Sequence, residues 1–391
     1  MFRQAASFLI TFLFSLSLLS QQKIRIEINS LPANNPANSS IFIAGNFNSW
    51  NPQNKNFQFQ KSDKGYFIDL SLNPGSYEYK ITRGGWDKVE CTNEGKDIGN
   101  RTLKVNADAS VEVAVSGWKD LFTSSSQPRK STANKNVRII DTAFFIPQLN
   151  RTRRVWVYVP PTYNNSTKKY PVLYMHDGQN VFDDATSFSG EWGVDEAVDT
   201  LGLKTKECIV VGIDNGSDKR LNEYCPYDFS LNGIAANNKT NIGEGGKYVD
   251  FLVKTLKPFI DKRYRTLKDS KNTFTAGSSM GGLISMYAVL KYPKVFGGAG
   301  VFSPAFWVGP KIFDDIRSKG KKVNAKIYFY AGDEEGETMV PMTIRAFNEM
   351  HRVSKSKMCE VIRAGGKHNE ARWRIEFPLF YEWMMKPPKS P

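Results

Sequence analysis

The sequence predicts an α/β fold for its C-terminal two thirds and a smaller all-β module in front of it. Two observations carry this prediction. Residues 273–282, TFTAGSSMGG, lead from an apolar strand through a glycine-rich turn into a helix of small residues. Between residues 24 and 115, short alternating or apolar segments are separated by turn residues instead, which is typical of a β-sandwich.

The turn at residues 277–281 has the pattern G-x-S-x-G, with Ser279 at its centre. A strand that turns sharply into a helix needs glycine on both sides of the central residue, because a Cβ atom there would collide with neighbouring backbone. The turn also lifts the central hydroxyl out of the sheet. Five residues alone are a weak signal, but the strand before them and the helix after them make Ser279 the candidate nucleophile.

A nucleophilic serine needs a general base, and the chain contains three histidines. His368 lies in a loop directly after an apolar strand, where the loop would carry it over the carboxyl end of the sheet. It is therefore the predicted base, which takes the proton from Ser279 and returns it to the leaving group. His351 lies in a polar helical stretch and is interpreted as a surface residue, and His176 as part of the pocket wall.

The acid that orients the base is expected between the serine and the histidine in the chain. An apolar strand at residues 327–331 ends there in Gly-Asp-Glu-Glu. Acids of this kind commonly lie three residues after the glycine, which favours Glu335, with Asp333 as the alternative. Glu334 and Glu337 are interpreted as a solvated acidic turn.

Two backbone N–H groups are the expected donors to the oxyanion that forms during acyl transfer. Met280 follows the nucleophile at the N-terminus of the predicted helix, and its N–H is the first expected donor. The loop at residues 176–180 follows an earlier strand and is expected to supply the second donor, from Gln179.

Residues from about 137 to 386 resemble the esterase-D-like branch of the α/β-hydrolases, which includes feruloyl and acetyl-polysaccharide esterases, siderophore (enterochelin) esterases and mycolyltransferases. The resemblance rests on RVWVYVPPTY at 154–163, YPVLYMHDGQN at 170–180, RLNEY at 220–224, the serine motif, SPAFW at 303–307 and HNEARW at 368–373. It implies an α/β-hydrolase fold. It also implies that Ser279 is the nucleophile, Glu335 the acid, His368 the base and Gln179 an oxyanion donor.

Four further side chains are candidates for the substrate pocket of such an enzyme, but packing within the scaffold is the favoured interpretation of the two tryptophans and of Arg220. They are Asp177, Trp192, Arg220 and Trp307. A pair between Arg220 and Glu223, which would shape their loop, is expected ahead of ligand contact by either residue.

Residues 22–118 resemble the starch- and glycogen-binding modules of amylolytic enzymes and of the β subunit of AMP-activated kinase. The resemblance rests on IAGNFNSWNP at 43–52, YKI at 79–81 and GGW at 84–86. It implies an immunoglobulin-like β-sandwich in which Trp86 stacks on a sugar ring, with Lys80 and Asn100 as further contacts and Trp50 in a structural role. Such modules also occur as spacers that orient or wall a catalytic domain, so both roles stay open.

Length and composition bound the remaining possibilities. The chain has 391 residues, of which 40% are hydrophobic, and this is enough for two domains. A basic N-terminus, an apolar stretch at residues 5–20 and an abrupt polar turn predict that residues 1–21 are a secretory signal peptide; an uncleaved anchor is the alternative. We therefore expect a secreted or periplasmic protein without a stable membrane span.

The formal net charge is +14, but the basic residues are spread along the chain and no nucleic-acid motif accompanies them, so nucleic acid is not an expected partner. A basic surface favours acidic polysaccharide, an anionic cell envelope or a negatively charged siderophore. The four cysteines, at positions 91, 208, 225 and 359, match no metal-site spacing. Neither a metal nor another cofactor is expected, and one disulfide or buried thiols are the two interpretations of the cysteines.

The polar, serine-rich residues 119–136 are predicted to be a linker, residues 137–386 an esterase domain and residues 387–391 a disordered tail. We expect an exported serine carboxylic-ester hydrolase that acts through an acyl-enzyme, with feruloyl or acetyl groups on polysaccharide as the first expected substrates. The alternatives are a siderophore esterase, an acyltransferase that uses another acceptor than water, and a catalytically inactive carbohydrate-binding protein.

Overall fold

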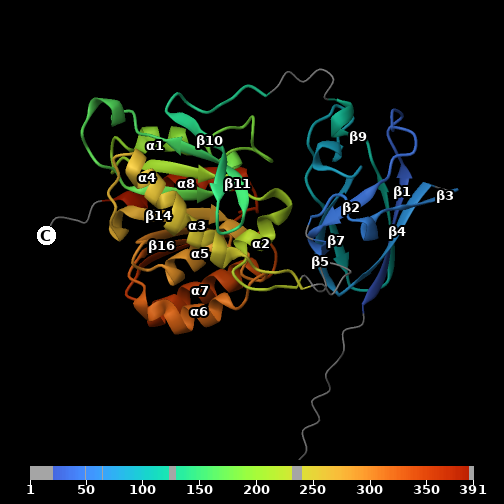
Figure 1. Cartoon of the computed structure of the whole chain (residues 1–391). Helices are drawn as coiled ribbons and strands as arrows, with labels where there is room; N and C mark the ends of the chain where they lie inside the picture. The colour runs from blue at the N-terminus through green and yellow to red at the C-terminus, as the bar shows by residue number, and fades with distance from the viewer. Residues whose placement is uncertain (1–20, 49, 64, 123–128, 231–239, 387–391) are drawn as a thin grey trace, which may run out of the picture. The chain divides into compact units, whose positions relative to one another are not determined.

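The computed structural model describes residues 21–48, 50–63, 65–122, 129–230 and 240–386. These residues form two compact units, one ending at Phe122 and the other beginning at Arg129, and each is described separately (Figure 1). The predicted signal peptide, apart from Gln21, and the predicted tail lie outside the described residues. Within the described ranges, no helix has the length and apolar character needed to cross a membrane.

The N-terminal unit is the all-β module that the alternating segments predict. One sheet has the strand order β3-β4-β1-β8, a second has the order β2-β5-β7, and β6 pairs with β9. The strands are β1 (Gln22–Ser30), β2 (Phe42–Gly45), β3 (Gln60–Ser62), β4 (Gly65–Leu72), β5 (Gly75–Thr82), β6 (Glu90–Cys91), β7 (Arg101–Val105), β8 (Ala109–Ala114) and β9 (Gly117–Trp118). The 3-10 helices of this unit are η1 (Asn46–Asn48), η2 (Lys55–Phe57), η3 (Trp86–Lys88) and η4 (Lys119–Leu121).

The core of this unit lies between its sheets. Ile24, Ile26 and Ile28 alternate with exposed or half-buried residues along β1 and belong to one buried cluster with residues of β2, β5 and β7, because successive side chains of a strand face opposite sides. Strand β7, which the apolar pattern did not indicate, contributes only two residues to this cluster, Leu103 and Val105.

The predicted linker is shorter in the structure than in the sequence-based prediction. At its start, Lys119–Leu121 form the 3-10 helix η4, and Leu121 packs against the core of the N-terminal unit. At its end, residues of the segment 129–136 form hydrogen bonds with the C-terminal unit. What remains between these parts is residues 123–128, which lie outside the described residues.

The C-terminal unit is built on an eight-stranded sheet in the order β10-β11-β13-β12-β14-β15-β16-β17. The pairs β10-β11 and β11-β13 are antiparallel, and all pairs from β13 to β17 are parallel. The strands are β10 (Val137–Ile146), β11 (Arg151–Tyr158), β12 (Val172–His176), β13 (Ile209–Ile213), β14 (Thr273–Ser278), β15 (Gly298–Phe302), β16 (Lys326–Gly332) and β17 (Lys357–Arg363).

Helices cover both faces of this sheet, as expected for an α/β-hydrolase (Figure 1). They are α1 (Val194–Leu201), α2 (Arg220–Tyr224), α3 (Gly245–Phe251), α4 (Lys257–Arg263), α5 (Met280–Lys291), α6 (Ile312–Lys319), α7 (Met339–Val353) and α8 (Glu370–Met385). A π-helical segment, η9 (Leu252–Leu256), joins α3 to α4, and the short 3-10 helices are η6 (Tyr163–Asn165), η7 (Gly178–Asn180), η8 (Ser217–Lys219), η10 (Ser270–Asn272) and η11 (Gly320–Lys322).

The core of the C-terminal unit explains why its strands are so apolar. All six residues of β14 are buried, because helices cover both faces of a parallel sheet and leave neither side to solvent. One face packs with α1 and α8 in a cluster that includes Phe302, Phe377 and Phe380. The four cysteines, all within the described residues, are unpaired, and three of them are buried thiols.

Candidate active site

Ser279 lies in the turn between β14 and α5, with backbone angles φ 58° and ψ −118°. A non-glycine residue at such a positive φ is uncommon and marks a strained turn. A Cβ atom would be tight on Gly277, 3.1 Å from the backbone of Gly281, and would clash on Gly282, 2.7 Å from the carbonyl oxygen of Phe302. On Gly281, the second glycine of the motif, it would make an ordinary contact at 3.4 Å, so the crowding expected at both glycines of the motif is found at Gly277 only. The strained turn at Ser279 is the geometry that the elbow motif predicts.

The elbow is also held by the neighbouring strand. Ser279 N–H donates to the carbonyl oxygen of Phe302 at 2.9 Å, and Ala305 N–H donates to the carbonyl oxygen of Ser279 at 3.0 Å. Both partners lie at or just after the end of β15, which pairs with β14. Ser279 therefore stands, half-buried, at the carboxyl end of the parallel sheet.

His368 and Glu335 lie at the same edge of the sheet, in the loops after β17 and β16. His368 Nδ1 lies 2.7 Å from Glu335 Oε2, and the Glu335 side chain is fully buried. The two loops come together because two glycines meet: a Cβ on Gly332 would lie 2.3 Å from the backbone of Gly366. The structure thus places a buried carboxylate against the histidine that the sequence singled out.

The other carboxylates of this turn have different partners. Asp333 Oδ1 accepts a hydrogen bond from Gly365 N–H at 2.7 Å, and Glu334 lies 3.6 Å from Lys367 in an exposed ion pair. Of the two acid candidates, Glu335 contacts the histidine, whereas Asp333 braces the backbone of the histidine loop.

Ser303, to which the sequence analysis gave no role, holds the Glu335 carboxylate and is itself held by Trp373. Ser303 Oγ donates to Glu335 Oε1 at 2.8 Å and accepts from Trp373 Nε1 at 2.9 Å. Trp373 also packs edge-on against the His368 ring, with centroids 5.0 Å apart. Ser303 follows β15, which lies between β14 and β16 in the sheet. Knowledge of the strand order would therefore have placed Ser303 between Ser279 and Glu335.

The predicted oxyanion donors lie at two adjacent strand ends. Met280 is the first residue of α5, and N–H groups in the first turn of a helix have no intrahelical acceptor. Gln179 lies in η7, directly after β12, which pairs with β14. Asn180 Nδ2 donates to Glu370 Oε1 at 3.2 Å, which ties this loop to the start of α8, two residues after His368.

Of the pocket candidates, Asp177 and Arg220 pair with each other. Arg220 Nε and Nη2 lie 2.6 and 2.8 Å from the two carboxylate oxygens of Asp177, and Asn215 Nδ2 donates to the same carboxylate at 2.7 Å. Burial alone would raise the pKa of Asp177, but Arg220 and Asn215 hold it below its usual value. This pair braces the loop at residues 177–180, and the Arg220 side chain stays partly exposed.

The expected pair between Arg220 and Glu223 is wrong. Glu223 is fully buried and instead contacts Arg151 and Arg153 of β11. Residues three apart in a helix can pair, but here each finds a partner outside α2: Arg220 pairs with Asp177, and Glu223 with the two arginines of β11.

The two tryptophan candidates differ. Trp192 is 4% exposed, stacks on Trp373 with centroids 5.7 Å apart and belongs to the core beneath α1 and α8, so its assignment to the pocket is wrong. Trp307 is 37% exposed. It lies two residues after Ala305, whose N–H bonds to Ser279, and it is the most exposed of the four pocket candidates.

His176 lies beneath the elbow and does not form a wall of the pocket. It is 2% exposed, and its ring nitrogens lie 3.0 Å from Tyr248 Oη and 3.1 Å from Thr275 Oγ1. Burial lowers its pKa to about 4. His351, by contrast, is exposed on α7, in agreement with its interpretation as a surface residue.

We expect the free energy of unfolding to fall as the pH is lowered from about 6.5 to about 4, the pKa values of His176 in the unfolded and folded chain. The unfolded chain binds more protons throughout this window, so stability rises with pH across it. The separation corresponds to about 3 kcal/mol. Urea denaturation at several pH values measures it, and His176→Asn, which cannot titrate, should flatten the curve. Equal pH dependence in both proteins would contradict the assignment.

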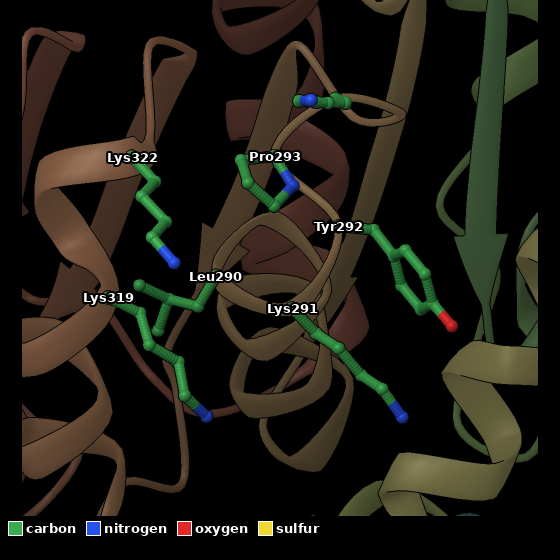
Figure 2. Close-up of a pocket in the computed structure, with 7 residues that line it drawn as sticks. Leu290, Lys291, Tyr292, Pro293, Lys319 and Lys322 are labelled. Carbon is green, nitrogen blue, oxygen red and sulfur yellow. The ribbon is translucent and has the colours of Figure 1, made fainter.

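A pocket of about 380 Å³ on the C-terminal unit lies away from this site (Figure 2). It is lined by Leu290, Lys291, Tyr292, Pro293, Lys294, Lys319 and Lys322. Ser279 precedes the first residue of the same twelve-residue helix, α5, and twelve residues span about 18 Å. Lys291 and Lys319 are paired with Asp250 and Asp315. The pocket therefore belongs to the opposite end of the helix from the candidate nucleophile.

In the N-terminal unit, the candidate sugar contacts lie on or beside β5 and β7. Trp86 begins η3, and its ring lies 6.3 Å from that of Trp50. Both indoles are half-buried, so Trp50, interpreted as structural, shares the surface of Trp86. Lys80 Nζ donates to the carbonyl oxygen of Ile98, and burial lowers its pKa. Asn100 Nδ2 donates to Glu78 at 3.0 Å.

The sheet order, the elbow and the histidine loop define an α/β-hydrolase. Residues 146–379 match a family model described as "Putative esterase", which covers more than half of the chain. The chain therefore belongs to this family of esterases. A crystal structure of the BES protein from Bacillus cereus has a TM-score of 0.54 at 16% identity, covering 67% of this chain and 100% of that chain, and this likeness concerns the fold alone.

Three curated relatives match different shares of the chain. The uncharacterized protein YbbA of Bacillus subtilis is 26% identical over 242 residues, 59% of this chain and 92% of that protein. An endo-1,4-beta-xylanase/feruloyl esterase of Xylanibacter ruminicola is 26% identical over 255 residues, 63% of this chain and 31% of that protein. An alpha-amylase of Niallia circulans is 42% identical over 94 residues, 23% of this chain and 7% of that protein.

Proposed function

We propose that the protein is an exported serine carboxylic-ester hydrolase in which Ser279 is the nucleophile, His368 the base and Glu335 the acid. The observation that carries the proposal is the 2.7 Å contact between His368 Nδ1 and the buried carboxylate of Glu335, at the same sheet edge as the strained elbow of Ser279. A carboxylate accepts the Nδ1 proton and thereby leaves Nε2 unprotonated, ready to accept a proton from the serine hydroxyl.

The chemistry follows from these positions. Ser279 Oγ attacks the ester carbonyl carbon while His368 Nε2 takes its proton, and the N–H groups of Met280 and Gln179 donate to the resulting oxyanion. The protonated histidine then donates to the leaving alcohol, and the acyl-enzyme remains. Water, deprotonated by the same histidine, attacks the acyl carbon and releases the acid and the free serine.

Esters carried by polysaccharide are the proposed substrates. One relative of the esterase domain is named a xylanase/feruloyl esterase, and this chain adds a β-sandwich unit to its own esterase domain. A formal charge of +14 also favours attraction to anionic polymers at low salt.

The test is a panel of esters offered to the mature protein: an aryl acetate, methyl ferulate, acetylated xylan and a catecholate trilactone. We expect the highest kcat/KM of the panel for acetylated xylan or methyl ferulate. If deacylation is slow, an initial burst should release alcohol in an amount equal to the enzyme concentration. Preference for the trilactone would assign a siderophore substrate. A folded protein that hydrolyses none of the four esters would overturn the proposal.

A second candidate function is glucan binding by the N-terminal unit. The Trp50 and Trp86 pair supports it, because a pyranose ring packs its apolar face against an indole. The alpha-amylase relative supports it as well, since its match of 94 residues is close to the length of this unit.

Trp86→Ala is expected to weaken binding to glycogen about tenfold or more, because the variant loses the stacking surface. Its kcat/KM on an aryl acetate should stay unchanged, since so small an ester needs no second contact. Co-sedimentation with glycogen measures the affinity. Tyr66→Ala, which removes a half-buried ring from β4 in the other sheet, is the control and should bind normally. Absence of glycogen binding in the unchanged protein would favour the spacer role.

A further inference from the structure

Residues 129–136, predicted from the sequence to be part of a linker, are held along the C-terminal unit, and we call them the strap. Ser131 Oγ donates to Asp183 Oδ2 at 2.8 Å, and Thr132 N–H donates to Asp183 Oδ1 at 3.2 Å. In return, Asp184 N–H donates to Thr132 Oγ1 at 2.8 Å. The strap therefore bonds both to the side chain and to the backbone of one turn.

Further bonds fix the strap on either side of this contact. Before it, Arg129 Nη2 donates to the carbonyl oxygen of Ser187 at 2.8 Å. After it, Asn134 N–H donates to Asp195 Oδ2 at 2.8 Å, and Asn134 Nδ2 donates to Asp199 Oδ2 at 2.9 Å. Four residues of the strap thus bond to the loop that follows η7 or to α1.

Asp183 accepts two of the hydrogen bonds between the strap and this turn. Its side chain is buried, with the residue 7% exposed, and it also accepts from Ala185 N–H at 2.9 Å. Two of the three donors to this carboxylate come from the strap. A buried carboxylate needs its hydrogen bonds, so the turn at residues 183–187 depends on the strap for its shape.

The same turn holds Gln179, the candidate oxyanion donor. Thr186 Oγ1 donates to the carbonyl oxygen of Gln179 at 2.8 Å and lies 3.2 Å from the carbonyl oxygen of Asp183. On its other side, Gln179 Oε1 accepts from Asn215 N–H at 3.2 Å. Gln179 is thereby held at its carbonyl and at its side chain, and the carbonyl support is linked to the strap through Thr186 and Asp183.

We propose that the strap positions the oxyanion donor Gln179, through Asp183 and Thr186, so that the segment leading into the esterase domain is part of its catalytic apparatus. Ser131, Thr132 and Thr186 are positioning residues in this assignment. The strap precedes residue 146, where the match to the esterase family begins. The proposal rests on the proposed function of Gln179.

The test uses the full mature chain with the double substitution Ser131→Ala and Thr132→Val. Loss of an oxyanion donor lowers kcat by about 100- to 1,000-fold, so a displaced donor should cost less, about tenfold, with KM changed by less than about twofold. Active-site titration with a fluorophosphonate gives kcat per competent enzyme. The affinity for an aryl trifluoromethyl ketone, which forms a tetrahedral oxyanion on the serine, should fall by a similar factor.

A second experiment tests Thr186, which joins the Asp183 turn to Gln179. Thr186→Val removes the hydroxyl that bonds Gln179 and should resemble the double variant, whereas Thr186→Ser keeps the hydroxyl and should retain kcat. Thr200→Val is the matched control, because Thr200 Oγ1 also donates to a backbone carbonyl, that of Glu196, on the exposed side of α1. Its kcat should equal that of the unchanged protein.

The outcomes separate this proposal from the proposed function. If the unchanged protein hydrolyses esters and the strap variants keep its kcat and ketone affinity, the strap proposal is overturned and the esterase stands. A loss of melting temperature without loss of kcat per titrated site also overturns it, because it shows a structural role only. If the unchanged protein hydrolyses no ester, it is the proposed function that fails.

Discussion

Replacing Ser279 by alanine is expected to lower kcat for an aryl acetate by about 10⁴-fold or more, because no other group in the site replaces the nucleophile. The residual rate would come from the oxyanion donors and from substrate binding. The variant should fold normally, since alanine keeps the Cβ atom that serine already accommodates at φ 58°. Steady-state hydrolysis together with thermal melting measures both expectations.

Ser278→Ala is the matched control for this experiment. Ser278 is the neighbouring residue of the chain, but it is the last residue of β14 and 6% exposed, so its hydroxyl does not stand at the top of the elbow. Its variant should retain most of the activity. Comparable losses in both variants, or full activity without the Ser279 hydroxyl, would refute the assignment of the nucleophile.

Glu335→Gln is expected to lower kcat by about 10³- to 10⁴-fold through the tautomer of His368. Glu335 Oε1 accepts from Gly332 N–H at 2.7 Å and from Ser303 Oγ, so the oxygen of a glutamine amide must occupy that position. The amide NH₂ then faces His368 Nδ1, which can only accept. The histidine proton moves to Nε2, where it prevents acceptance of the serine proton.

Asp333→Asn separates the two acid candidates. Its amide oxygen can still accept from Gly365 N–H, as the carboxylate does, so kcat should change by less than about threefold, as for a typical surface substitution. A severe loss in this variant with a mild loss in Glu335→Gln would make Asp333 the acid. Mild losses in both would indicate a serine and histidine that act without a carboxylate.

The sequence by itself was enough to predict the fold class and the elbow, because both depend on local requirements. A sharp turn between a strand and a helix favours glycines close to Ser279, where a Cβ atom would be tight or would clash, and a buried parallel strand demands an unbroken apolar run. The alternation of apolar and polar residues in β1 predicts the β-sandwich, because it too depends on a local requirement, one buried face for each strand. His368 followed from there being only three histidines to consider.

The partners of the polar side chains were decided only by the tertiary structure. Glu335 and Asp333 lie two residues apart in one turn, and the choice between them depends on Ser303 and Gly366, which lie in the loops after two other strands. Trp192 is of a residue type that often contacts ligands, but it is buried in the core. Arg220 pairs with Asp177 and not with Glu223. The polar strap looked like a linker because its bonds go to residues about 50 to 65 positions away. Periodicity reports which side of an element is buried, but a hydrogen bond between distant segments exists only once the sheet has brought their ends together.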